Sequence, residues 1–174
     1  MSAHSKGRKV MISQKSASVM VWGSVTYGGK SPLVFVDKGV KLNQSTYQNE
    51  ILQKKLLPWS KQHFKKNNWV FQQDSAPAHK ANTTQRWCED NLHGFINAND
   101  WPPYSHDLNP LDFSVWSILE SRGCSKPFEN VKQLKASLVK AWNSIDDDTI
   151  RKIVDQFPDR LTKCIENEGG YIEN

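Results

Sequence analysis

The sequence predicts one α/β domain over residues 1–174, with helices packed on a mixed sheet. Three observations predict this class. Two runs of β-branched and aromatic residues flank an early glycine turn, a third short apolar run lies farther on, and the second half repeats apolar residues at helical spacing. A chain that begins with strands, continues with alternating strands and helices, and ends with helices is typical of an α/β domain. With 37% hydrophobic and 24% charged residues, the chain has the balance of a globular domain with one core.

The first predicted pair of strands is a hairpin. Residues 18–26 and 33–36 are the two apolar runs, and residues 27–30 supply the turn. A helix is expected after Asn43, a typical N-cap residue, with Pro58 at a kink or boundary. Its apolar positions are Tyr47, Ile51, Leu52, Leu56 and Trp59.

The second half begins with a short strand over residues 69–71, followed by a helix through residues 87–92 and a further short strand at 95–96. Neighbouring prolines make residues 101–105 an extended loop. Asn109 then offers a cap to a helix that carries Asp112 in its first turn. Two more helices are expected on two apolar sets: Val131, Leu134, Leu138 and Trp142, then Ile150, Ile153, Val154 and Phe157.

Composition narrows the class of protein. No apolar run approaches the ~18 residues of a membrane span, and residues 1–15 do not have the pattern of a secretory signal. The spacing of Cys88, Cys124 and Cys164 fits neither a disulfide framework nor a zinc site, so we expect reduced thiols that act as small buried side chains. We expect most tryptophans in the core.

Charge is distributed unevenly along the chain. Residues 1–73 hold 12 Lys and Arg but two acids, whereas residues 74–174 hold 11 Lys and Arg and 16 acids. The first half is therefore suited to a polyanion such as nucleic acid, with ordinary solvated surface charge as the alternative.

Two acids stand apart by position. Asp74 follows an apolar strand, and Asp112 opens a helix. Carboxylates that converge from different elements can hold a divalent metal ion, the usual means of activating water for phosphodiester cleavage. The alternatives are a turn aspartate for Asp74 and a helix-start acid for Asp112. For the acids at 146–148, helix capping is favoured over a metal cluster.

Two longer stretches carry motifs of a known family. Residues 70–79 are VFQQDSAPAH and residues 105–113 are SHDLNPLDF. Both resemble the catalytic core of mariner-type transposases, which are cut-and-paste DNA transposases of the Tc/mariner superfamily. Further blocks match in the same order at residues 18–23, 39–43 and 161–171. The resemblance covers about residues 7–172.

This resemblance implies an RNase H-like fold, a mixed sheet flanked by helices, with three acids that bind two divalent ions, Mg²⁺ or Mn²⁺. Asp74 matches the second acid and Asp112 the third. The family's partner is DNA, both transposon ends and target, and the resemblance also implies a homodimer, a nuclear location, and neither a membrane nor a small-molecule substrate.

The same resemblance indicates residues that approach DNA. Arg8, Lys9 and Lys15 lie in a segment similar to the family's region between its first two strands, with a loose basic tail as the equal alternative. His79 and Lys80 lie about one helical turn past Asp74. For His79, a capping or buried histidine is the alternative.

The chain departs from the family pattern at its start. The family's first acid lies on a first strand upstream of residues 19–22, but residues 1–36 contain no Asp or Glu. We therefore expect an incomplete sheet that lacks its first strand, and self-association through the exposed edge of the 19–22 strand. Ser75 stands where the family usually has Asn, and His106 where it has Pro.

The leading hypothesis is thus the catalytic domain of a transposase, N-terminally truncated, with at most one weakly bound Mg²⁺ or Mn²⁺ and no strand cleavage. The alternative is a non-catalytic remnant or a domesticated module that binds nucleic acid. A third hypothesis is an unrelated α/β domain whose basic half binds RNA or an acidic protein.

Overall fold

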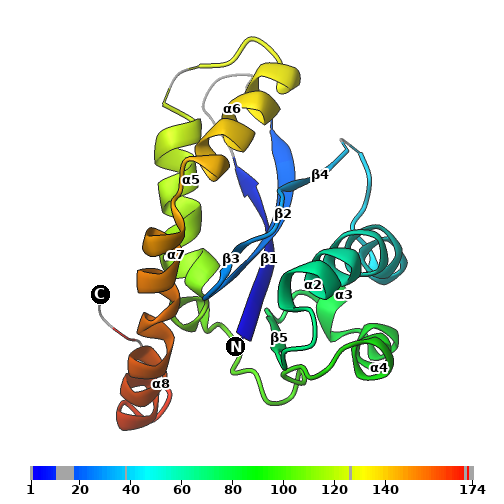
Figure 1. Cartoon of the computed structure of the whole chain (residues 1–174), viewed down its shortest axis with the longest axis vertical. Helices are drawn as coiled ribbons and strands as arrows, with labels where there is room; N and C mark the ends of the chain where they lie inside the picture. The colour runs from blue at the N-terminus through cyan, green and yellow to red at the C-terminus, as the bar shows by residue number, and fades with distance from the viewer. Residues whose placement is uncertain (1, 11–17, 38, 126, 171, 173–174) are drawn as a thin grey trace.

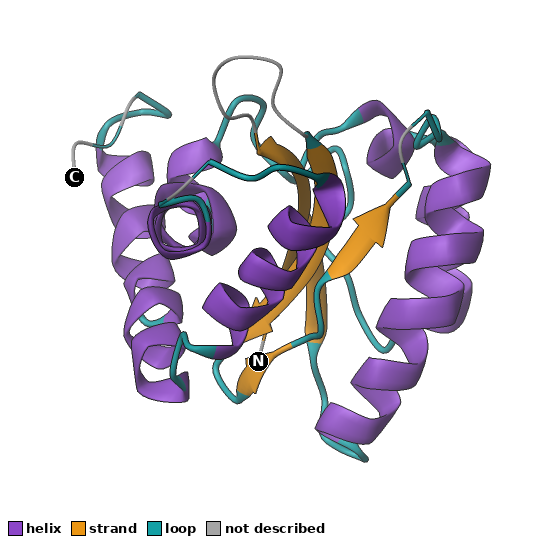
Figure 2. Ribbon diagram, turned by 90° about the horizontal axis from the view of Figure 1, so that it is seen from above, coloured by secondary structure: helices purple, strands orange, loops and turns teal. Residues whose placement is uncertain are grey.

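A computed structural model gives the fold of the chain; it describes residues 2–10, 18–37, 39–125, 127–170 and 172, with side chains from residue 18 onward. The elements form three layers, a twisted sheet between two groups of helices (Figures 1 and 2). The strands are β1 (Ser2–Val10), β2 (Val19–Thr26), β3 (Gly29–Lys30), β4 (Val34–Val36) and β5 (Val70–Gln73). They follow the order β3-β2-β1-β5, and β4 also pairs with β2.

The predicted hairpin is present, with its second strand divided in two. β3 pairs with the end of β2, and β4 pairs with its first half in the antiparallel register Met20↔Val36. β2 is buried along nearly its whole length because helices cover both faces of the sheet. Val19 and Val25 face one helical layer, and Trp22 belongs to the core on the other side.

The sheet contains a strand upstream of β2, which covers the edge that was expected to be exposed. Residues 2–10 form β1, which runs antiparallel to β2 from His4↔Val25 onward and parallel to β5 up to Ser5↔Gln73. This basic segment shows no apolar alternation, but β2 and β5 both offer unpaired backbone groups, and any extended chain can satisfy them. The edge of β2 is therefore covered, so the expected self-association through it loses its basis.

The first helical layer follows the sequence prediction closely. Its elements are α1 (Gln44–Thr46), the π-helix η1 (Tyr47–Leu56), α2 (Leu57–Phe64), α3 (Pro77–Lys80) and α4 (Asn82–Asn91). Asn43 caps the layer by accepting a hydrogen bond from the Thr46 amide. Pro58 lies in the first turn of α2 and so marks the boundary between the π-helix and the α-helix. Proline is tolerated in the first turn of a helix because it has no N–H to donate there.

The second layer comes from the other half of the chain. Its elements are the short 3₁₀ helix η2 (His106–Leu108), the π-helix η3 (Leu111–Val115), α5 (Trp116–Gly123), α6 (Val131–Asn143), α7 (Asp147–Val154) and α8 (Gln156–Glu166). Asp146 accepts from the Thr149 amide at 2.7 Å and so caps α7, as expected. Residues 95–96 contribute a single parallel bridge, Phe71↔Phe95, instead of a strand.

Most tryptophans lie in the core, as expected, with Trp22, Trp116 and Trp142 almost completely buried. The three cysteines are free thiols, and burial raises the pKa of Cys88 to about 12. Over the residues that the structure describes, no helix combines the length and apolar composition that a membrane span requires.

Candidate active site

Asp74 is the first residue after β5, where the buried run Phe71, Gln72 and Gln73 ends. Its Oδ1 accepts a hydrogen bond from the Ala76 amide at 3.0 Å, which is the bond that a turn aspartate makes two residues on. The turn alternative therefore describes Asp74 correctly. The same bond fixes the carboxylate at the end of the strand, so the turn role and a site role are compatible.

His79 holds the same carboxylate oxygen. Its Nδ1 lies 2.6 Å from Asp74 Oδ1, and the histidine is only 3% exposed. The Tyr47 ring lies against the imidazole with a centroid distance of 4.2 Å. The structure thus shows His79 as a buried histidine whose ring supports Asp74.

Buried and partly buried polar groups form hydrogen bonds around His79 and hold it in place. Tyr47 Oη donates to Gln73 Oε1 at 2.9 Å, and the amide of Gln85 donates to the His79 carbonyl at 2.8 Å. Tyr47 and Gln73 are also buried. The orientation of Asp74 is thus set by a network that joins η1, β5, α3 and α4. The sequence analysis did not find this network, because its members are far apart in the chain and each one fits a core role.

Asp112 lies in the first turn of η3 with a side chain 9% exposed. Asn109 Nδ2 donates to Asp112 Oδ2 at 3.0 Å, while Asn109 Oδ1 accepts from the Leu111 amide. His106 Nδ1 lies 3.5 Å from the same oxygen. Asn109 was expected as a cap; its spacing of three residues from Asp112 is the signal that could have predicted this second role.

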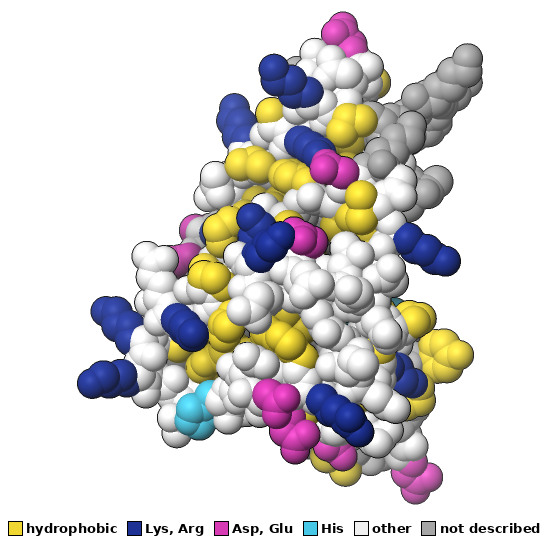
Figure 3. All heavy atoms as spheres, turned by 90° about the vertical axis from the view of Figure 1, so that its right-hand side faces the viewer, with side chains coloured by type: hydrophobic (Ala, Val, Ile, Leu, Met, Phe, Trp, Pro, Cys, Tyr) yellow, Lys and Arg dark blue, Asp and Glu magenta, His cyan; other side chains and the backbone are white. Residues whose placement is uncertain are grey.

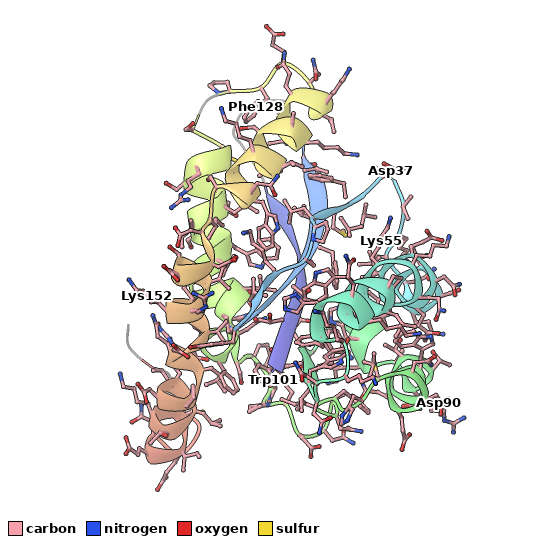
Figure 4. The ribbon with its side chains drawn as sticks, viewed as in Figure 1. Asp37, Lys55, Asp90, Trp101, Phe128 and Lys152 are labelled. Atoms are coloured by element: carbon pink, nitrogen blue, oxygen red, sulfur yellow. The ribbon has the colours of Figure 1, made fainter. Side chains whose placement is uncertain are left out.

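Both acids line one cavity of about 370 Å³. Lys80, Tyr104 and His106 line the same cavity, together with the buried Trp101. Figure 4 labels Trp101 on the loop that passes between the two helical layers at one end of the sheet. The sheet end and the helix start therefore bring the two predicted acids to one place, although they are far apart in sequence.

The donor set fits one hard divalent ion but not two. Carboxylate oxygens are the protein ligands that Mg²⁺ prefers, and Mg²⁺ usually keeps several of its waters. In the part of the chain whose side chains the structure describes, no three His, Cys, Asp or Glu residues are grouped to hold a metal ion. A two-ion site needs ions ~3.5–4 Å apart and an acid between them to offset their repulsion.

β1 occupies the sheet position next to Asp74, and its residues include no acid. The last register pair between β1 and β5 is Ser5↔Gln73, so the residues that follow are Lys6 and Asp74. The strand beside β5 therefore contributes no carboxylate next to Asp74.

The structure describes only some of the residues that were predicted to contact DNA. Arg8 and Lys9 belong to β1, where the structure describes backbone alone, and Lys15 lies outside the described residues. Lys80 is exposed and lines the cavity. Figure 3 shows the face that carries η1, α2 and α4, over which Lys and Arg side chains are spread with acidic and hydrophobic side chains between them. Its exposed lysines are Lys54, Lys55, Lys61, Lys65 and Lys66.

Comparison with known proteins identifies the family. A family model described as DDE superfamily endonuclease matches residues 2–135. The chain therefore belongs to the DDE superfamily endonucleases, within the group of Tc/mariner transposases.

Among its relatives, the Tc3 transposase of Caenorhabditis elegans is 34% identical over 157 residues, which cover 89% of this chain and 45% of the relative. The Tcb1 transposase of Caenorhabditis briggsae is 31% identical over 153 residues, 87% of this chain and 53% of the relative. The chain thus spans about half the length of these curated relatives.

Solved structures confirm the fold class. The catalytic domain of the Mos1 mariner transposase superposes with a TM-score of 0.83 at 19% identity, covering 99% of this chain and 84% of that one. The Mos1 paired-end complex with Mn superposes with a TM-score of 0.82 and covers 56% of that chain. The RNase H-like α/β fold predicted from the sequence is correct.

Proposed function

We propose that this chain is the catalytic-domain part of a cut-and-paste DNA transposase and that it binds DNA across the cavity between Asp74 and Asp112. The observation that carries the proposal is the convergence of these two carboxylates, from a strand end and a helix start, on one cavity. Membership of the endonuclease family and the transposase relatives support it.

The cavity is proposed to hold one Mg²⁺ or Mn²⁺ on Asp74 and Asp112. When bound, such an ion supplies a Lewis acid that polarises phosphate oxygens. The chain's own residues prepare the ligands: the Ala76 amide and His79 fix Asp74, and Asn109 fixes Asp112. Lys80, exposed on the same cavity, supplies a positive charge for a DNA phosphate.

Strand cleavage by these 174 residues is not proposed, because β1 brings no carboxylate beside Asp74. This observation favours a second candidate function, a module that binds DNA without cutting it. A nuclear location and a homodimer belong to the same proposal. The homodimer is supported by the Mos1 paired-end complexes, because pairing two DNA ends requires two DNA-binding sites.

A nicking assay on transposon-end DNA tests the two candidates. The wild-type chain is incubated with Mn²⁺ and supercoiled DNA that carries the end, beside Asp74→Ala and Asp90→Ala. Asp90 is an exposed acid on α4, away from the cavity, and serves as the matched control (Figure 4). We expect DNA binding and no nicking by any of the three proteins. Nicking that disappears in Asp74→Ala but persists in Asp90→Ala would contradict the non-cleaving account.

A further inference from the structure

Tyr104 has a location that the site described above does not explain. It lines the cavity that contains Asp74 and Asp112, yet 91% of the residue is exposed. Among the large hydrophobic residues that the structure describes, this is the highest exposed fraction; Ile165 follows at 71%, and the other exposed tyrosine, Tyr27, reaches 44%. A tyrosine ring held this far into solvent at the mouth of a cavity leaves both of its faces accessible.

The backbone under this ring is strained. Tyr104 has a φ of +61°, a region that bulky residues rarely adopt and that glycine adopts freely. The surrounding loop holds it there: Ser105 Oγ donates to the Pro102 carbonyl at 2.9 Å, and the buried Trp101 and Leu108 anchor the loop at its ends. Since glycine suits this backbone better, a tyrosine here is explained by its side chain and not by the fold.

The chemistry around the ring indicates what it binds. A flat aromatic face stacks on a nucleobase whatever its identity, and a nearby lysine attracts the phosphate attached to that base. Lys80 lines the same cavity and is exposed. Bases inside a duplex already stack on each other, so an open ring face at the cavity mouth suits a base that has lost its pairing.

We propose that Tyr104 stacks on an unpaired DNA base next to the phosphate that enters the cavity. This inference rests on the proposed function, because it requires DNA at that cavity. It assigns the loop between Trp101 and Leu108 a role in holding a frayed or single-stranded DNA end.

The test compares three variants with the wild-type chain by fluorescence anisotropy in about 50 mM salt. The probes are a short labelled single-stranded oligodeoxynucleotide and the blunt duplex of the same sequence. Tyr104→Gly removes the ring and relieves the backbone strain, Tyr104→Phe keeps the ring, and Tyr27→Ala removes an exposed tyrosine outside the cavity. Thermal melts and sedimentation are measured on the same samples.

We expect Tyr104→Gly to bind the single strand about five- to hundredfold more weakly, with a smaller loss on the duplex and no loss of thermal stability. Tyr104→Phe and Tyr27→Ala should bind as the wild type does. Unchanged single-strand affinity in Tyr104→Gly, or an equal loss on both probes, overturns the inference while the proposed function stands. A change in sedimentation without a change in DNA affinity assigns the ring to a contact between copies and also overturns it. No DNA binding by the wild type overturns the proposed function and this inference together.

Discussion

At the scale of single residues, the informative feature is the number of groups that hold each acid. Two groups contact Asp74 Oδ1: the Ala76 amide donates a hydrogen bond to it, and His79 Nδ1 lies 2.6 Å away. The Ala76 amide fixes the carboxylate within the turn, and the buried ring of His79 limits its rotation. An acid in an ordinary turn needs only the first of these contacts. The second contact, from a buried histidine, holds the carboxylate in one orientation, which suits a preorganised metal ligand.

Two substitutions of His79 separate positioning from packing. The amide nitrogen of Asn stands where His has Nδ1, whereas that of Gln stands where His has Nε2. We therefore expect His79→Asn to keep Mn²⁺ affinity close to that of the wild type, and His79→Gln to lower it about ten- to hundredfold. Mn²⁺ titration followed by electron paramagnetic resonance measures this. Equal affinities in the two variants would show that His79 only fills space.

His63 gives the fold a dependence on pH. Its Nε2 lies 3.0 Å from Thr26 Oγ1, and burial lowers its pKa, partly opposed by the charge of Asp147. The unfolded chain therefore binds a proton more readily than the folded one, so this group's stabilisation is complete above pH ~6.5 and is lost as the pH falls through the lower folded pKa. We expect the melting temperature to fall between pH ~7.5 and ~5.5, and to fall less in His63→Gln. An identical pH profile in the variant would refute this role.

At the scale of elements, prediction from sequence succeeded where a local pattern decides the structure. The β2 hairpin, β5, the Asn43 cap and the helices of the second half all follow from apolar spacing and capping residues. β1 could not be predicted, because its strand conformation comes from the backbone groups of its two neighbours and not from its own basic sequence. The π-helical turns of η1 and η3 also lack a signal in residue type.

The two acids could be predicted from the sequence, but their arrangement in one site could not. Asp74 and Asp112 were found because each stands at a recognisable boundary, a strand end or a helix start. That they share a cavity depends on how the end of β5 and the start of η3 are brought together in the fold, which no local pattern encodes. The burial of His79 depends in turn on Tyr47 of η1, a contact between elements that are distant in sequence.

Deleting residues 1–10 tests the contribution of β1. Without that strand, β2 and β5 each present an unpaired edge inside what was a continuous sheet, and such edges pair with other chains. We expect the deleted chain to self-associate in sedimentation and to lose its cooperative thermal melt. Lys9→Gln changes charge but keeps the backbone, and should leave both properties intact. A monomeric deletion variant with an unchanged melt would show that residues 2–10 do not pair as β1.

At the scale of the whole molecule, the sheet is continuous from β3 to β5, but its charges differ from those that a two-ion site needs. The strand beside Asp74 carries Lys6, Arg8 and Lys9 in its sequence and no acid. Basic residues favour the DNA backbone and disfavour cations, so the composition of this strand suits the proposed DNA binding better than metal binding. The cavity with two acids and the basic strand beside it both fit the proposed module that binds DNA without cutting it.

One substitution should restore the missing charge. Continuing the register of β1 and β5 places position 6 beside Asp74, so Lys6→Asp removes a cation and adds a carboxylate at the same sheet position. We expect this variant to bind Mn²⁺ at least about tenfold more tightly than the wild type, a gain of ~1.4 kcal/mol, because three carboxylates then converge on the cavity. Mn²⁺ titration measures the gain, and the nicking assay shows whether cleavage accompanies it.

The neighbouring position supplies the control. Adjacent positions of a strand point to opposite faces of the sheet, so Ser5→Asp adds a carboxylate within one residue but on the face away from position 6. It should leave Mn²⁺ affinity unchanged, although it makes β1 more acidic by one charge. If Ser5→Asp and Lys6→Asp raise the affinity equally, the gain reflects net charge alone. If neither raises it, β1 does not deliver position 6 to the cavity, and the site lacks more than one carboxylate.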